Sequence, residues 1–239
     1  MIKPNVASWR YINVSNAFNV SLKMNDEGNR YGFSNNVDNH MMKNSEWAVV
    51  SYLSQSKYGK LGNKSFTGAN KEIYQNKSNS YIVGCSYGSP SNGNTDYGCQ
   101  YTYDIDINGT GASTTGNIYG IYDMSGGAWE YVMGNYNNLI GNSGFSDTLT
   151  LDSKYYNKYT SNDVKTACDG SECLSHGLSE TSSWYHDYFV MLNEVYPWFM
   201  RGGSFEFVNS AGIFGFVATS NYGGGAHAAS FRLTLAFSN

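Results

Sequence analysis

The strongest constraint on the fold is where the chain keeps its apolar residues. Residues 117–133 form a compact apolar run, which predicts a buried pair of strands. Residues 199–237 alternate apolar and small residues, which predicts further strands around a Gly-rich loop at residues 222–225. Residues 62–115 and 135–194 are rich in Asn, Gly and Ser and predict long loops. The pattern therefore indicates a strand framework with long loop insertions.

Two stretches show helical spacing. Residues 13–24 have Ser15 or Asn16 as the expected N-cap and place three apolar side chains on one face: Ala17, Val20 and Met24. Residues 43–56 predict a helix that packs on the core through Trp47, Val50, Leu53 and Ser54. Helices and strands together predict an α+β fold. The length fits a single domain spanning residues 1–239.

Composition narrows the function classes. Charged residues make up only 14% of the chain, whereas Tyr and Gly number 21 and 27, a palette typical of surfaces that recognise other molecules. The net charge of -4 and the lack of a Lys/Arg cluster predict no nucleic-acid partner. No apolar run is long enough to span a bilayer, and residues 1–5 contain no apolar signal core. We expect no direct membrane insertion by this segment, with any N-terminal anchor or leader absent from it.

The four cysteines form two close pairs in loop sequence, Cys85 with Cys99 and Cys168 with Cys173. Of the possible pairings, two local disulfides are the simplest, each closing a surface loop in an oxidising compartment. A zinc site from Cys168, Cys173 and His176 is an alternative that lacks a spaced fourth ligand. Free thiols are a third possibility. We expect no cofactor and no metal.

Three short sequence runs are specific enough to suggest a family. Residues 119–131 read Tyr-Gly-Ile-Tyr-Asp-Met-Ser-Gly-Gly-Ala-Trp-Glu-Tyr, residues 201–204 read Arg-Gly-Gly-Ser, and residues 230–233 read Ser-Phe-Arg-Leu. In order and spacing these runs resemble the signature of the formylglycine-generating enzyme (sulfatase-modifying factor) family, and weaker similarity at residues 41–56 extends the resemblance over most of the chain. The resemblance implies that family's elaborated C-type-lectin-like fold, with Trp129 and Phe231 as buried framework residues.

The resemblance does not extend to catalysis. Enzymes of that family depend on cysteines between the last two elements, and this chain has none between residues 204 and 230. Gly127 replaces the Asn of the family's Ser-Gly-Asn-Val run, which weakens the case for a calcium site near Glu130. The histidines are scattered and suggest no base beside a nucleophile. We therefore expect no catalytic residue and no enzyme activity. A family catalyst with altered chemistry is the alternative.

The C-terminal segment resembles the variable region of diversity-generating retroelement proteins of gut bacteria and their phages, which carry a C-type-lectin-like fold. Their mutagenesis rewrites adenines, so a randomised Asn codon never becomes Lys, Glu, Gln, Met or Trp. Those types fill 34 of the first 201 positions but only one, Glu206, of the last 38. A buried hairpin would also lose charged residues. However, an unpatterned mix of residue types beside frame-like runs at 211–216 and 230–232 favours the retroelement interpretation.

Residues 204–230 are therefore the predicted variable, ligand-binding region. Apolar side chains exposed on so polar a protein would form an interaction patch. The expected ligand-contacting positions are Phe205, Phe207, Val208, Asn209, Gly215, Val217, Ala218, Ser220, Asn221, Tyr222, Gly224, His227, Ala228 and Ala229.

This interpretation implies a receptor-type binding protein. The expected partner is a protein or glycan ligand on another cell or particle. The expected location is the cell surface, the secreted fraction or a phage virion. A purely structural surface or virion component without a ligand is the remaining alternative.

Overall fold

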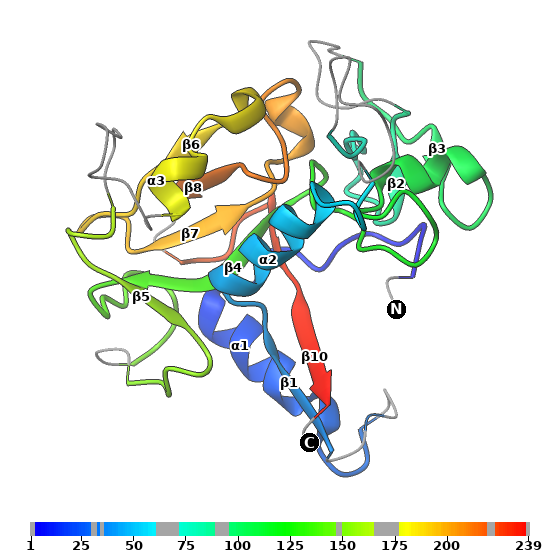
Figure 1. The fold of residues 1–239 in the computed structure, drawn as a ribbon. Coiled ribbons are helices and arrows are strands. Elements are labelled where there is room, and N and C mark those ends of the chain that lie inside the picture. Colours follow the sequence, from blue (N-terminus) through cyan, green and yellow to red (C-terminus); the bar gives the residue numbers. More distant parts are fainter. Residues whose placement is uncertain are drawn as a thin grey trace.

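The computed structural model describes residues 3–29, 33, 36–60, 72–88, 96–146, 150–164, 177–218 and 223–237. Helices and strands mix along this part of the chain, which confirms the α+β class (Figure 1). The α-helices are α1 (Val14–Leu22), α2 (Asn44–Ser54) and α3 (Gly177–Thr181). Short 3-10 helices are η1 (Lys23–Asn25), η2 (Ile107–Ala112), η4 (Trp184–His186) and η5 (Phe205–Phe207). The strands are β1 (Val37–Met41), β2 (Cys85–Ser86), β3 (Tyr101–Thr102), β4 (Trp129–Tyr136), β5 (Asn157–Tyr159), β6 (Phe189–Val190), β7 (Trp198–Arg201), β8 (Phe216–Ala218), β9 (Ala229–Phe231) and β10 (Leu233–Phe237).

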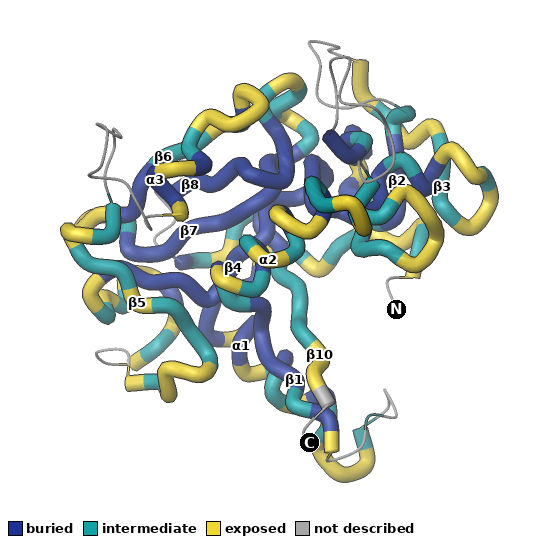
Figure 2. Tube along the Cα trace, viewed as in Figure 1, coloured by how far each residue is buried: buried dark blue, intermediate teal, exposed yellow. Residues whose placement is uncertain are grey.

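The main sheet is built around β4. Its strand order is β5-β4-β7-β8-β6, and β9 also pairs with β4. Strand β7 runs antiparallel along one edge of β4, whereas β9 and β5 pair in parallel with its first and last residues. Every residue of β4 and β7 is buried (Figure 2). Burial on both faces explains why residues 129–136 show no polar alternation in the sequence.

Two smaller sheets flank this framework. Strands β1 and β10 pair antiparallel, with Met41 opposite Leu233, and together with α1 they extend away from the main sheet (Figure 1). Strands β2 and β3 form a short pair in the loop-rich part of the chain. The expected disulfide between Cys85 and Cys99 closes this region and is present. Cys168, Cys173 and His176, and with them the second disulfide and its zinc alternative, lie outside the described residues.

The strand pair expected at residues 117–133 is wrong in its first half. Only β4 forms, and residues 117–128 make turns before it. Gly126 and Gly127 have φ of 77° and 69°, and a Cβ atom on Gly126 would lie 2.2 Å from the Asn76 carbonyl oxygen. Such backbone geometry and close approach require glycine and interrupt a strand. Residues 122–128 are nevertheless buried. The apolar pattern of the sequence therefore indicates that these residues are buried, not that they form a strand.

Both expected helices form, with shifted details. Helix α1 begins one turn earlier than expected, because the Asn13 side chain accepts a hydrogen bond from the Asn16 backbone N–H at 2.8 Å. Helix α2 buries Trp47 completely, and its first turn is held by Glu46, which accepts from the Lys43 backbone N–H at 2.8 Å. Leu53 does not pack on the core as expected. It is 55% exposed, because the buried face of α2 carries Ser51 and Ser54 instead.

Aromatic residues fill both sides of the main sheet. Trp129, expected as a framework residue, is 3% exposed and packs in a core cluster with Phe18, Trp198 and Met200. The same expectation is wrong for Phe231, which is only partly buried and meets the exposed Trp9 edge-on at 5.8 Å.

None of the helices in the described part of the chain is long and apolar enough to cross a membrane.

A buried ion pair connects two of the three sequence runs that carry the family resemblance, residues 119–131 and 230–233. Arg232 donates through Nε and Nη2 to both carboxylate oxygens of Glu130, the Nη2–Oε1 distance being 2.7 Å. Nη2 also lies 3.1 Å from the backbone carbonyl oxygens of Tyr122 and Asp123. Burial opposes the charge on Arg232, but the attraction and hydrogen bonds of Glu130 outweigh it and raise the Arg232 pKa. Glu130 is thus occupied as an ion-pair partner.

We predict that Glu130→Gln destabilises the protein by about 3 kcal/mol or more, because the substitution leaves a buried guanidinium without a counterion. Urea unfolding followed by circular dichroism measures this as a lower midpoint. Glu194→Gln is the control, since Glu194 is exposed. An unfolding midpoint for Glu130→Gln equal to that of the control would contradict the structural role of the pair.

Two buried carboxyls have raised pKa values. Burial and repulsion by Asp187 raise the Glu72 pKa to about 9, against the opposing attraction of Lys60. Burial also raises the Asp187 pKa to about 7, against hydrogen bonds from the backbone N–H groups of Phe214 and Gly215. Neither Glu72 Oε1 nor Asp187 Oδ1 has a hydrogen-bond partner among the described residues. In the unfolded chain both groups titrate near their ordinary values of 4.5 and 3.8.

The folded state therefore binds more protons than the unfolded state, and the stability linked to these groups is lost as pH rises through 7 toward 9. We predict a lower free energy of unfolding at about pH 8 than at about pH 5, with a shallower slope in Glu72→Gln, whose amide does not ionise. Urea titrations at the two pH values test this. A slope in Glu72→Gln as steep as in the unaltered protein would refute the assignment.

Candidate ligand-binding surface

The predicted variable region leaves the core at the end of β7. Gly202 and Gly203 have φ of 87° and 74°, and a Cβ atom on Gly203 would lie 2.5 Å from the Cα of Ala211. These glycines turn the chain sharply. Only residues without a Cβ atom fit this turn, because the neighbouring backbone lies so close. The buried Ser204 follows, and η5 then emerges at the surface. The Phe205 backbone N–H donates to the Gly127 carbonyl at 2.9 Å and fixes this turn on the framework.

The two phenylalanines of η5 are half-buried against aromatic neighbours. Phe205 meets Tyr81 and Tyr97 edge-on, with ring centroids 5.0 and 5.5 Å apart. Phe207 packs edge-on against the framework residue Trp129 at 5.1 Å and contacts Tyr188 at 5.0 Å. Each ring is thus supported by aromatic neighbours and remains partly exposed.

A second loop, residues 223–228, is held through its own backbone carbonyls. The Gly223 carbonyl accepts from the backbone N–H of Val14, and the Ala226 carbonyl accepts from that of Tyr11. The Gly224 carbonyl accepts from the Tyr131 hydroxyl at 2.8 Å, and the His227 carbonyl accepts from Arg10 Nη1 at 2.6 Å. None of these four bonds uses a side chain of the loop. The four bonds are therefore independent of the side chains at residues 224, 227 and 228. Gly223 and Gly225 are not replaceable in this way, because a Cβ atom on either would lie 2.7 Å from a neighbouring atom.

The two loops meet at the surface. Glu206 Oε1 and His227 Nε2 lie 3.8 Å apart, although 21 residues separate them, and both side chains are exposed. Arg10 links the same area to Tyr81, over whose ring its guanidinium lies at 4.0 Å. We call residues 205–209, 224, 227 and 228, with Arg10, Tyr97 and Tyr188, the loop surface. It combines exposed aromatic rings with few charges, a chemistry suited to contact rather than to bond-making.

Four of the expected ligand-contacting positions are buried. Val217 and Ala218 belong to β8, which lies between β7 and β6, and are 8% and 5% exposed. Ala229 begins β9 against Trp129 and is fully buried, and Gly215 is buried just before β8. The expectation that these residues are displayed is corrected. Strand β8 is paired on both edges and buried, Ala229 is buried where β9 pairs with β4, and Gly215 is buried directly before β8. Ser220, Asn221 and Tyr222 lie outside the described residues.

The remaining positions divide by exposure. Phe205, Phe207, Val208, Gly224 and Ala228 are half-buried, and Asn209 and His227 are exposed. The structure thus gathers these seven positions on two adjoining loops, whereas three of the four buried positions belong to strands β8 and β9 and the fourth, Gly215, directly precedes β8.

Sequence reasoning missed the neighbours that complete the loop surface. Tyr97 is 52% exposed and Tyr188 is 40% exposed, and both contact the phenylalanines of η5. Tyr11, 70% exposed, lies beside Arg10. The high Tyr content was the only signal available for them. It could not single out these three tyrosines, because their proximity depends on contacts between segments far apart in the chain.

The described residues contain no group of three or more His, Cys, Asp and Glu side chains able to hold a metal ion. On the loop surface itself, the only described acid–base neighbours are Glu206 and His227, at 3.8 Å and both exposed.

No protein-family profile matches the chain, and no curated protein matches it either.

We predict that exposure separates tolerant from intolerant positions. Asn209→Ala should change the free energy of unfolding by less than about 0.5 kcal/mol, as at other surface sites. Val217→Ala should cost about 2 kcal/mol, because it removes apolar contacts inside the sheet. Urea unfolding of both variants provides the comparison. Equal costs would show that the boundary between loop surface and framework is misplaced.

Proposed function

We propose that the protein is a non-catalytic, receptor-type binding protein whose loop surface is diversified by a retroelement. The observation that carries the proposal is the backbone anchoring of residues 223–228 by Tyr11, Val14, Tyr131 and Arg10. Random replacement is tolerated only where side chains do not determine the local fold. Main-chain carbonyls bound to partners outside the loop meet that requirement.

The proposed fold is the C-type-lectin-like fold of the formylglycine-generating enzyme type, in a single domain. The α+β architecture is compatible with it, and two of the three residue runs that carry the resemblance meet in the buried ion pair between Glu130 and Arg232. The proposal does not include that family's catalysis, because no cysteine lies between residues 204 and 230 to act as a nucleophile.

The proposed ligand is a protein or glycan on another cell or particle. Half-buried aromatic rings with one supported side, such as Phe205 on Tyr81, are the kind of rigid anchor that dominates binding interfaces. The proposed location is the cell surface, the secreted fraction or a phage virion. The Cys85–Cys99 disulfide supports a location in an oxidising environment.

We predict that Phe205→Ala and Tyr97→Ala each weaken ligand binding by at least about tenfold, as loss of an aromatic anchor does. The purified protein is screened on a glycan array and on a display library of bacterial surface proteins, and each hit is titrated with the variants. Tyr119→Ala is the matched control, because Tyr119 is an exposed tyrosine outside the loop surface.

Hits that bind the Phe205 and Tyr97 variants as tightly as the control would refute the assigned surface. The retroelement origin has a separate test in the flanking DNA. A near-copy of the codons for residues 202–233 that differs at adenines, beside a reverse transcriptase gene, is the expected finding. Its absence from the complete genome would refute diversification while leaving the binding surface open to the first test.

A further inference from the structure

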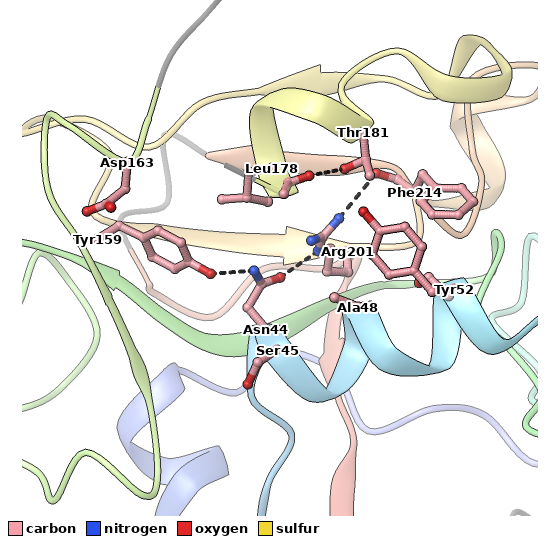
Figure 3. A pocket seen from close by; sticks show the side chains of 12 residues that line it. Asn44, Ser45, Ala48, Tyr52, Tyr159, Asp163, Leu178, Thr181, Arg201 and Phe214 are labelled. Carbon is pink, nitrogen blue, oxygen red and sulfur yellow. Dashed lines mark hydrogen bonds between the residues drawn. The ribbon is translucent and has the colours of Figure 1, made fainter. Parts of the chain in front are cut away.

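A pocket of about 240 Å³ lies apart from the loop surface, between α2, α3, the chain after β5 and the last residue of β7 (Figure 3). Its polar wall contains Arg201, Asn44 and Tyr159, and its apolar wall contains Ala48, Leu178 and Phe214. At roughly 30 Å³ per water molecule, this volume suits a small organic molecule rather than a macromolecular segment.

Arg201 is the only cationic residue among the described residues that line this pocket. It is 4% exposed, its Nε donates to Asn44 Oδ1 at 2.8 Å, and its Nη1 donates to the Phe214 carbonyl at 3.2 Å. The Nη2 amino group donates to no residue in the described part of the chain. No carboxylate within these described ranges forms a salt bridge with Arg201, in contrast with Arg232 and Glu130.

A buried guanidinium without a counterion is costly. Burial lowers the Arg201 pKa to about 10, partly offset by Tyr159, Tyr52 and Asp187, so the side chain stays positively charged at neutral pH. The free-energy cost of desolvating such a charge is offset only when an anion or several hydrogen-bond acceptors face it. The two neutral acceptors that Arg201 has leave the pocket-facing side of the guanidinium unmatched.

Two hydroxyl groups face the same space. The Tyr159 hydroxyl accepts from Asn44 Nδ2 at 2.5 Å, and its own proton has no acceptor among the described residues. The Tyr52 hydroxyl points toward Arg201 (Figure 3), and it forms no hydrogen bond with any described group. One guanidinium edge and two hydroxyl groups that line the same pocket offer hydrogen-bond donors to a carboxylate.

The rest of the lining limits the ligand further. Asp163 also lines the pocket, with its Oδ2 bound by Thr160, and its carboxylate disfavours a doubly charged anion such as phosphate. The rings of Tyr52 and Phe214 and the side chain of Leu178 offer an apolar surface for a flat or branched body. A single negative charge on a small apolar body matches both walls.

We infer that the pocket around Arg201 binds a small organic monocarboxylate, whose carboxylate is held by Arg201 Nη2 and the hydroxyls of Tyr159 and Tyr52. The site is independent of the loop surface and of the ligand bound there. Its position beneath α2 and α3 allows occupancy to stabilise the junction of these helices with β7.

Benzoate and its neutral isostere benzamide are the probes, titrated into the full chain by isothermal calorimetry and by NMR. We predict saturable benzoate binding that is at least about tenfold tighter than benzamide binding, because hydrogen bonds to a charged group are the stronger ones. Ala48→Phe fills the pocket from α2 and should abolish benzoate binding. Val49→Phe is the matched control, since Val49 is the next residue of α2 and is 57% exposed.

Ser45→Trp is a second blocking variant, chosen because Ser45 is exposed at the pocket and its replacement does not disturb the core. It keeps the test valid if Ala48→Phe fails to fold by circular dichroism. Absence of saturable benzoate binding would overturn the inference. So would equal affinity for benzamide, or binding that survives in a folded blocking variant.

Discussion

The buried ion pair between Glu130 and Arg232 holds the strands of the framework together. It joins the start of β4 to the junction of β9 and β10, and Arg232 also binds the carbonyls of residues 122 and 123. Strand β4 in turn pairs with β7, β9 and β5. Because a desolvated charge pair permits little displacement, these elements are fixed in one arrangement. The loops that leave them therefore start from defined positions.

The loop surface follows from that arrangement. Residues 205–209 leave β7 through two glycines, and residues 223–228 precede β9, so both loops begin or end on strands next to β4. The second loop is held by bonds to its own carbonyls, and the first rests on Gly127. Binding specificity can then change with the side chains while the backbone stays in place. This separation of framework and display is the physical basis of the proposed function.

Arg201 and Arg232 both belong to the short sequence runs that carry the family resemblance, but their electrostatic surroundings are opposite. Arg232 has a bidentate carboxylate partner, whereas Arg201 has an amide oxygen, a backbone carbonyl and an open pocket. The first is saturated by the protein itself and serves the framework. Arg201 instead presents hydrogen-bond donors to a cavity lined by tyrosines, an arrangement that favours binding of an anion.

The sequence by itself determined the α+β class, helices α1 and α2, the buried Trp129 and the local Cys85–Cys99 bridge, because each depends on short-range spacing or local chain closure. It also located the segment that carries the loop surface. Only the tertiary structure decided which residues of that segment are displayed. Val217 and Ala229 resemble Val208 and Ala228 in the sequence, yet pairing with β7 and β4 buries the first two. The same holds for Tyr97 and Tyr188, and for the edge of Arg201 that faces the pocket. Their roles arise from contacts between distant segments, which no local pattern encodes.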